Sequence, residues 1–539
     1  MTNALPVRGD QLMIYDFKEM TNNTVIKTDL CIIGAGAAGI SIAQYFIGKR
    51  FQVCVVESGG FEFDAATQSL YEGKNIGLNY YPLDATRLRY FGGSSNHWGG
   101  WCAPLREIDF EQRDWVPYSG WPINQHDLEV YYIQAQKLCE IGPYRYRVDD
   151  WEKGRFKRLD VLEDKLINLL WQHSPSQTKF GKRFHQELEQ ANNVQVLLHA
   201  NVLEIISKDN GLAVEGVKIS RLDATKTATV QAKVVVLAGG GLENPRILLT
   251  SNRVQSTGLG NQNDNVGRFF MEHAHVGIGE LVTSRSSQAL AYYKDHSVRE
   301  GIHLQPILGI SEIAQQKHKM VNVSILMHSH GRREQTEAYR AFQHISQALK
   351  SGIFSDNFPD DLVEKIAKLT NNKAASGLYD LPPLPHNTHL TFRTLSEQVP
   401  NPESRVSLDT ETDVLGLPKI QLNWRLTELE KRSISIATQL VSEELERLNL
   451  GQLQRFEWLL SENEAFEGVV GGHHHMGTTR MSENPKQGVV DKNCRVHGLA
   501  NLYIAGSSVF ATSGCSNPTL TLVALAVRLA EHLETQVLR

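Results

Sequence analysis

A chain of 539 residues is long for one compact core, so two or three lobes are expected. Charged residues make up 21% of the chain and hydrophobic residues 41%, a balance that excludes an intrinsically disordered protein. The net charge of −5 is mild and no long basic block occurs, so we expect no nucleic-acid partner.

The cysteines and the N-terminal residues indicate a cytoplasmic protein. Six cysteines are scattered without a CxxC pair, which favours a reducing compartment over a disulfide framework. The first thirty residues carry several charges and no apolar run, so no secretory signal is readable. Residues 31–48 lack charges and approach the lower length of a membrane helix, but their glycine spacing favours a nucleotide site, so no transmembrane segment is expected.

Residues 28–60 predict a strand, a glycine turn, a helix and a second strand. Gly34, Gly36 and Gly39 form GxGxxG after the apolar run LCII, and FQVCVVE ends in Glu57. In such a turn the first glycine permits the tight bend, the second admits a pyrophosphate and the third lets the helix approach the sheet. An acid about 20 residues further on can accept hydrogen bonds from ribose hydroxyls. The segment therefore predicts a site for an adenine dinucleotide.

A second fingerprint of this kind is missing from the sequence. Residues 232–251, AKVVVLAGGGLENPRILLTS, have a buried strand and a glycine turn, but GGGLEN breaks the spacing. A pyridine-nucleotide reductase with bound flavin normally carries two such fingerprints. One dinucleotide site favours a flavin that an organic substrate reduces directly.

The remaining elements alternate between strand-like and helix-like patterns. Residues 202–207, 214–220 and 227–233 predict an antiparallel meander between strands of the nucleotide domain. Further predicted elements are alternating strands in 389–409 and 418–426, two helices within 335–375, a helix over 427–450, a strand at 501–506 and a helix over 519–533. Asn517 and Pro518 form a start signal for the last helix, with Asn517 as its cap.

Five motifs in this order resemble the glucose–methanol–choline oxidoreductases, flavoproteins that oxidise alcohols, and the pyranose 2-oxidase and bacterial sugar dehydrogenase branch in particular. They are GAGAAG with Glu57, RYFGGSSNHWGG (89–100), NVGRFFMEH (265–273), HHMGTTRM (474–481) before VVDKNCRVHG (489–498), and NLYIAGSSVF…SNP (501–518).

The resemblance and the predicted elements together imply an α/β fold, α+β overall. A Rossmann-like FAD-binding domain, discontinuous in sequence, is expected to comprise residues 1–105, 190–275 and 456–539. Residues 106–189 are expected to be a connecting or cap segment. Residues 276–455 are expected to form the substrate-binding domain, built on an antiparallel sheet with helices.

The resemblance also implies roles for particular residues. The family's base is a histidine three positions before a Gly–Thr pair, which is His474 here, and its partner at the start of the last helix is Asn517. Gly506 stands where the family more often has Asp, which changes the hydrogen bond expected there. The expected FAD-binding residues are Gly34, Gly36, Gly39, Glu57, Arg89, Gly92, Gly93, Ser94, Asn96, His97, Val202, Gly239, Gly506, Pro518 and Thr519.

His97 has a further implied role. In pyranose oxidases the histidine of an S-T-H-W segment bonds covalently to the flavin, and this sequence has Asn96 where that segment has Thr. Covalent attachment at His97 and a histidine that lines the pocket without a bond both stay open.

The chemistry of alcohol oxidation fits the pair His474 and Asn517. A base must take the hydroxyl proton, and histidine has its ordinary pKa near neutral pH, while an amide can hold the oxygen without competing as a base. If residues 473–475 are extended, His473 and His475 face one side and His474 the other. The alternatives are a helix cap for Asn517 and a histidine without a proton role for His474. Adjacent histidines diverge and no carboxylate or cysteine accompanies them at ligand spacing, so no metal is expected.

The sequence thus predicts FAD-dependent oxidation of a sugar- or polyol-like alcohol by hydride transfer to flavin. Electrons would pass to oxygen, a quinone or a redox protein. Two alternatives remain from other classes, a non-redox lyase on the same fold and a flavin-binding protein without turnover. A specialised biosynthetic alcohol is also open as substrate, because no motif in residues 276–455 selects one.

Overall fold

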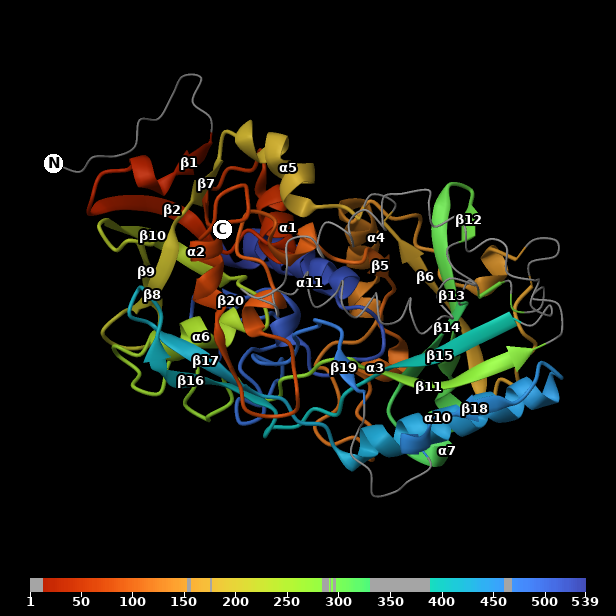
Figure 1. The fold of residues 1–539 in the computed structure, drawn as a ribbon. Coiled ribbons are helices and arrows are strands. Elements are labelled where there is room, and N and C mark those ends of the chain that lie inside the picture. The colour runs from red at the N-terminus through yellow and green to blue at the C-terminus, as the bar shows by residue number, and fades with distance from the viewer. Residues whose placement is uncertain are drawn as a thin grey trace, which may run out of the picture.

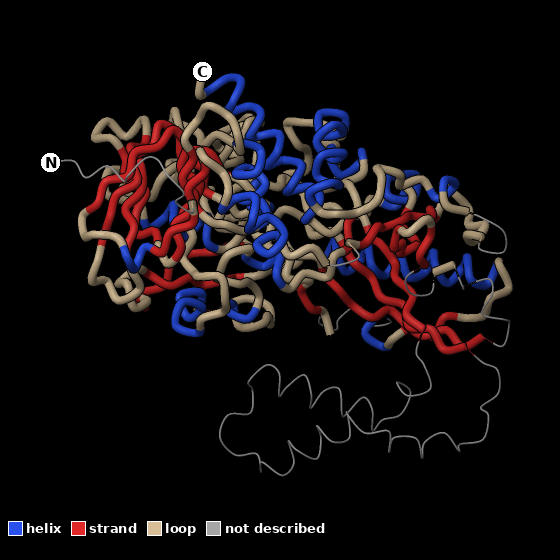
Figure 2. Tube along the Cα trace, turned by 90° about the horizontal axis from the view of Figure 1, so that it is seen from above, coloured by secondary structure: helices blue, strands red, loops and turns tan. Residues whose placement is uncertain are grey.

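The computed structural model describes residues 13–152, 157–174, 177–283, 290, 292–293, 297–329, 388–459 and 468–539. Two large sheets lie at opposite ends of the molecule, with helices between them (Figures 1 and 2). The predicted helices within 335–375 lie outside the described residues. The α/β class with a Rossmann-like lobe and a second sheet-based lobe is confirmed.

The first sheet is mainly parallel at its centre, and its strands run in the order β1-β7-β3-β2-β10-β9-β8, with β20 also paired to β10. Strand β3 and the last four residues of β2 (LCII) are buried, continuous apolar runs, as expected for strands covered on both faces. The strands are β1 (Ile14–Asp16), β2 (Thr24–Ile33), β3 (Val53–Val56), β7 (Val194–Leu198), β8 (Asn201–Ser207), β9 (Val214–Ser220), β10 (Thr227–Leu237) and β20 (Leu502–Ile504).

The predicted meander is confirmed, since β9 pairs antiparallel with both β8 and β10. Residues 228–237 of β10 also run parallel to β2, and residues 235–237 run parallel to β20, so one strand belongs to both patterns. Residues 31–48 are divided between β2 and α1 (Ala37–Phe46). Within the described residues, no helix is long and apolar enough to cross a membrane.

The second sheet is largely antiparallel, in the order β18-β11-β15-β14-β13-β6-β5, with β12 on β13 and β19 on β11. Helix α10 (Glu428–Arg447) packs on this sheet and begins with a capping box between Thr427 and Glu430. The strands are β5 (Trp101–Cys102), β6 (Leu166–His173), β11 (Ala274–Thr283), β12 (Ser297–Arg299), β13 (Ile302–Ile310), β14 (Val323–Ser329), β15 (Thr388–Ser396), β18 (Leu453–Arg455) and β19 (Val470–Gly471).

The predicted segment boundaries do not coincide with the sheets. Strand β6 lies in the predicted connecting segment 106–189 yet pairs with β13 along its whole length. A small third sheet joins β16 (Arg405–Thr412) and β17 (Pro418–Asn423) to β4 (Gly73–Asn75). It thereby links a part of the predicted substrate domain to the predicted FAD domain. Backbone pairing over long sequence distances decides sheet membership, which local patterns do not report.

Several helices lie between the two sheets (Figure 1). Among them, α11 (Thr519–His532) packs against α1 and α4 (Glu129–Leu138). All six cysteines are buried and free, as the sequence predicted. The other helices are α2 (Ala65–Gln68), α3 (Glu107–Phe110), α4 (Glu129–Leu138), α5 (Phe180–Glu189), α6 (Glu243–Thr250), α7 (Glu312–His318) and α11 (Thr519–His532).

Candidate active site

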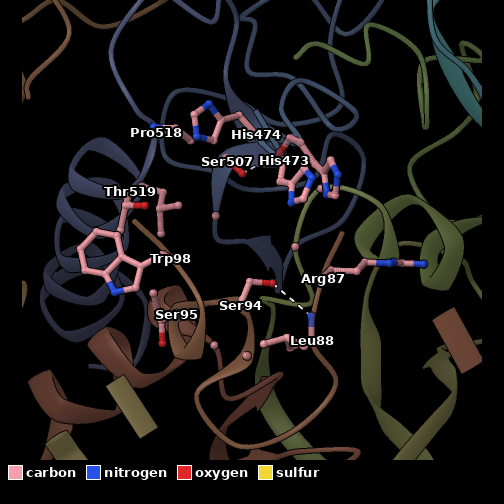
Figure 3. Close-up of a pocket in the computed structure, with 18 of the residues that line it drawn as sticks. Arg87, Leu88, Ser94, Ser95, Trp98, His473, His474, Ser507, Pro518 and Thr519 are labelled. Carbon is pink, nitrogen blue, oxygen red and sulfur yellow. Dashed lines mark hydrogen bonds between the residues drawn. The ribbon is translucent and has the colours of Figure 1, made fainter. Parts of the chain in front are cut away.

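A cavity of about 400 Å³ lies where the first sheet, the loop before β5 and the start of α11 meet. Figure 3 shows side chains from these segments around it. Its walls are formed by Gly34, 36–38, Glu57, Tyr71, 85–88, 93–95, 97–101, 238–242, 472–475, 506–507, 517–519 and Leu522.

The glycine turn after β2 forms one wall. Gly34 has φ +101°, and a Cβ there would lie 2.7 Å from the Ala238 carbonyl oxygen, so the bend requires glycine. A Cβ on Gly39 would lie 2.0 Å from the Gly34 oxygen, which fits a helix held close to the turn. A Cβ on Gly36 would meet nothing within 4 Å, so this backbone faces the open cavity.

Glu57 lies at the end of β3 with its carboxylate fixed by the turn beside it. Oε2 accepts a hydrogen bond from the Ala35 N–H at 2.8 Å, and Oε1 accepts one from the Gly59 N–H at 2.9 Å. The side chain is 6% exposed and lines the cavity. A carboxylate has further acceptor sites, so hydroxyl groups of a ligand can still donate to it.

The loop that contains GGSSNHW lies against the same turn. Gly93 has φ +54°, and a Cβ on it would lie 3.2 Å from the Gly36 Cα. Ser94 accepts a hydrogen bond from the Leu88 N–H and lines the cavity (Figure 3). His97 follows the 3-10 turn Gly93–Asn96, is exposed, and lines the cavity as well.

Ten of the predicted cofactor residues and both predicted catalytic residues line this cavity. Five predicted residues do not line it, and four of these have structural contacts within the loop and turn or belong to the first sheet. Asn96 donates to the Phe91 carbonyl oxygen, the Gly92 N–H donates to the Ala35 carbonyl oxygen, and Val202 is buried in β8. Gly39 supports the turn from behind.

Arg89, the fifth, does not line the cavity and forms a buried ion pair. Its guanidinium lies 3.1 Å from the buried Glu243 carboxylate. The guanidinium groups of Arg87 and Arg246 form ion pairs with the same carboxylate at 3.4 and 3.2 Å. Burial by itself would raise the pKa of Glu243, but the three arginines lower it to about 2. Arg87, not Arg89, lines the cavity, with its guanidinium 3.8 Å above the Tyr71 ring. The sequence pattern could not separate two arginines two residues apart.

The three adjacent histidines diverge, although their backbone is not regularly extended. His473 has φ +60°, so the stretch is not extended, and the condition on which the alternation depended is not met. Its exposed ring contacts Tyr81 with ring centroids 4.5 Å apart, while the buried His475 ring lies 3.0 Å from the Tyr80 hydroxyl. The His474 ring lies on the side of the cavity where Pro518 precedes α11, away from His473 (Figure 3).

His474 contacts a second histidine that the sequence analysis did not single out. Its Nδ1 lies 2.8 Å from Nδ1 of His273, a fully buried residue immediately before β11. Nε2 of His273 lies 2.9 Å from the Gly514 carbonyl oxygen and 3.3 Å from that of Ser513. Burial, together with the nearby His273 and His275, lowers the pKa of His474 well below its ordinary value, so the ring is neutral at neutral pH.

Glu272 fixes the backbone of the histidine segment. The fully buried carboxylate accepts hydrogen bonds from the N–H groups of Gly472 at 2.9 Å and His474 at 2.8 Å, and from the Tyr80 hydroxyl. Burial raises the pKa of Glu272 to about 7 despite these donors. The motif ending in Glu272 and His273 was visible in the sequence, but the contacts lie about 200 residues apart and leave no local signal.

Asn517 lies two residues before the start of α11, and its side chain does not cap the helix. The helix begins at Thr519 without a side-chain cap, so the predicted cap is wrong. Its Nδ2 instead donates a long hydrogen bond of 3.5 Å to the Trp101 carbonyl oxygen, and the half-buried side chain lines the cavity. Pro518 and Thr519 place the first turn of α11, with its free N–H groups, at the same wall.

Comparison with known proteins identifies the family. A model described as FAD dependent oxidoreductase matches residues 29–256, and one described as GMC oxidoreductase matches residues 400–526. The chain belongs to the glucose–methanol–choline (GMC) oxidoreductases. The two matches include both the glycine turn and the histidine segment that form the cavity.

Individual GMC relatives are similar at low identity. The chain is 22% identical over 577 residues to 2-methyl-1,2-propanediol dehydrogenase of Mycolicibacterium austroafricanum, which covers 94% of this chain and 95% of that protein. It is 25% identical over 307 residues to the fructose dehydrogenase large subunit of Gluconobacter japonicus, covering 56% of this chain and 47% of that protein. A formate oxidase variant from Aspergillus oryzae RIB40 shares the fold, with a TM-score of 0.53, 17% identity and coverage of 96% of this chain and 100% of that one.

This GMC oxidoreductase is an FAD-dependent enzyme, and the cavity fits that cofactor. Gly36, Gly240 and Gly506 line the cavity at positions where an added Cβ would meet nothing within 4 Å, so ligand can approach their backbone. Glu57 offers an acceptor at the end of β3, as a ribose requires. Within the described residues, no cluster of side chains is suited to hold a metal ion.

Proposed function

We propose that this enzyme oxidises a sugar- or polyol-like alcohol to a carbonyl compound, with His474 as general base and Asn517 as the group that positions the hydroxyl. The observation that supports it most strongly is that both side chains line the cavity that the glycine turn and Glu57 also line. FAD supplies the hydride acceptor when it is bound. The names of the relatives, a diol dehydrogenase and a fructose dehydrogenase, fit this substrate class.

The neutral state of His474 suits a base. Because burial lowers its pKa, the ring keeps an unprotonated nitrogen at neutral pH and can take the hydroxyl proton. The Asn517 amide can donate a hydrogen bond to the oxygen as negative charge develops on it, and it has only a long contact to give up. The first turn of α11 adds a positive dipole end at the same wall, where it stabilises negative charge on a bound group.

The proposal is tested by mixing the purified holoenzyme anaerobically with a panel of alcohols and following the visible absorption band of the flavin. Bleaching by one sugar or polyol would establish hydride transfer and name the substrate class. Rapid return of colour in air would identify an oxidase, and slow return a dehydrogenase that uses a quinone or a redox protein. If no alcohol of a broad panel bleaches bound flavin, the sugar or polyol proposal fails, and a non-redox lyase or oxidation of a specialised biosynthetic alcohol becomes the better-supported function.

Covalent attachment of FAD at His97 stays a prediction. The exposed His97 side chain lines the cavity, so it has the access that a bond would need. The test compares flavin fluorescence at the protein band on a denaturing gel for the parental enzyme and the His97→Ala variant. Fluorescence in the parent alone would support attachment at His97. Fluorescence in both would exclude His97, and fluorescence in neither would exclude a covalent bond.

A further inference from the structure

His273 has no part in the function proposed above, yet it connects the two catalytic segments. Its ring lies between the His474 ring and the carbonyl oxygens of residues 513 and 514, three residues before Asn517. No solvent reaches the side chain, since it is 0% exposed. Each ring nitrogen therefore has a fixed protein partner, and the proton positions follow from what those partners can do.

The carbonyl oxygens of Ser513 and Gly514 determine which nitrogen of His273 is protonated. A carbonyl oxygen only accepts hydrogen bonds, so Nε2 of His273 must carry the proton that is donated to Gly514. Burial lowers the pKa of His273 to about 4, and a neutral imidazole has one N–H. Nδ1 of His273 is then an acceptor.

The contact between His273 and His474 also determines which nitrogen of His474 is protonated. Two acceptor nitrogens cannot share a hydrogen bond at 2.8 Å, so Nδ1 of His474 must be the donor. The lone pair of neutral His474 is then on Nε2. When His474 takes a proton on Nε2, its Nδ1–H donor becomes charged and the hydrogen bond to His273 strengthens.

Backbone hydrogen bonds between the two segments fix the positions of both rings for this contact. Met271 and Met476 exchange backbone hydrogen bonds of 2.9 and 3.0 Å, and Ala274 pairs with Gly471 in the β11–β19 ladder. Glu272 adds its bonds to Gly472 and His474 from the same segment. The charged or titratable groups around the pair are Glu272, His275, Glu397, Arg393, His473 and His475.

We propose that His273 is a positioning residue that fixes His474 in the tautomer protonated at Nδ1, leaving Nε2 as the basic nitrogen. This inference rests on the proposed role of His474 as base. It names a residue that acts on the reaction only through another side chain. If the His273 ring served only to fill space, it would not determine which nitrogen of His474 is protonated.

The variants His273→Leu and His273→Asn separate hydrogen bonding from packing. Leucine removes the acceptor, whereas the asparagine Oδ1 lies close to the former Nδ1 and can accept from His474. We expect His273→Leu to reduce flavin about 10- to 100-fold more slowly under saturating alcohol, the effect typical of losing a group that orients a catalytic histidine. His273→Asn should recover most of that loss. His275→Leu is the matched control. The ring centroid of His275 lies 6.1 Å from that of His474, and no hydrogen bond joins the two side chains among the described residues.

A spectroscopic measurement reads the tautomer directly, apart from turnover. In protein labelled with ring-¹⁵N histidine, the His474 signals are assigned by their loss in His474→Ala. The proposal expects a protonated Nδ1 and an unprotonated Nε2 in the parent and in His273→Asn, and mixed or reversed protonation in His273→Leu. A protonated Nε2 in the parent would overturn it, as would equal slowing by leucine and asparagine.

A double variant distinguishes failure of this inference from failure of the proposed base. If His474→Ala keeps the parental rate, the base assignment itself is wrong. If His474→Ala is slow but His273→Leu stays within about twofold of the parent, a difference at the level of ordinary noise in such data, only the positioning role is wrong. If both are slow, adding His273→Leu to His474→Ala should cause no further loss, and a further loss would show that His273 acts by another route.

Discussion

The cavity has two walls that work by different means. The wall formed by Gly34, residues 36–38, 239–241 and Gly506 presents backbone, because three of its glycines leave open space where a side chain would begin. The wall formed by residues 472–475 presents imidazole rings, each held by a different neighbour. We expect the first, the glycine wall, to bind the cofactor by close backbone approach, and the second, the histidine wall, to act through the protonation states of its rings.

We therefore predict that substitutions in the two walls impair the enzyme in different ways. A change on the glycine wall should remove the cofactor and leave the protein folded. A change on the histidine wall should leave the cofactor in place and slow the chemistry. Each prediction below tests one side of that contrast, from the largest expected effect to the smallest.

The largest effect is expected from Gly36→Val. The backbone at Gly36 has φ −81°, which valine adopts, and its Cβ would enter the cavity without touching protein. The purified variant should therefore contain less than about a tenth of the parental FAD, because the added side chain occupies the path of the pyrophosphate. FAD released by acid or heat measures this, and an unchanged melting midpoint of the apoprotein is the control. Full FAD content would show that the glycine wall does not bind by close backbone approach.

Acid should destabilise the histidine wall through His273. Its pKa falls from the ordinary 6.5 to about 4 on burial, so between these pH values the unfolded chain binds a proton that the folded chain does not. Through His273, the free energy of unfolding should therefore fall as the pH falls below 6.5, by about 3 kcal/mol at pH 4. Melting midpoints from pH 8 to pH 4 should fall less steeply for His273→Asn than for the parent. Parallel curves would contradict this.

His474→Ala should slow flavin reduction about 10²-fold, equivalent to about 2.7 kcal/mol of barrier, because the general base is lost. FAD content should stay at the parental level, since the glycine wall is intact. Stopped-flow absorbance with excess alcohol gives the rate. His473→Ala is the comparison, and it should slow the reaction less because that exposed ring contacts Tyr81. Equal rates for His474→Ala and the parent would remove the base assignment.

Asn517→Ala is expected to have the smallest effect, about tenfold or 1.4 kcal/mol on flavin reduction, the contribution of one hydrogen bond to a developing charge. Because Asn517 does not cap α11, its loss should leave the melting midpoint unchanged. A variant that melts several degrees lower while reducing flavin at the parental rate would assign Asn517 a structural role instead.

The part of the glycine wall in residues 34–39 could be predicted from sequence because its three glycines lie within one turn. The structure shows the bend at Gly34, open space at Gly36 and close packing at Gly39. The helix that begins at Thr519 was equally readable from its Asn–Pro start and apolar pattern, although the cap was assigned wrongly.

The histidine wall could be predicted only in part. The motif indicated His474, but the contacts with His273 and Glu272 join segments about 200 residues apart, and no local pattern encodes such a pair. The same limit applies to β6, which a boundary drawn from local texture placed outside the second sheet. Arg89 was predicted because the loop motif begins there, but both arginines pair with Glu243 and only Arg87 lines the cavity.

The pairing of β20 with β10 has a consequence for how the chain folds during synthesis. The β9 partner of residues 227–231 precedes them in the sequence, whereas residues 235–237 on the same edge of β10 pair with residues 502–504, far later in the sequence. Until residues 502–504 have been synthesised, residues 235–237 keep unpaired N–H and carbonyl groups on that edge. Open strand edges of this kind recruit other chains, so we expect the nascent protein to need this edge shielded until β20 has been synthesised.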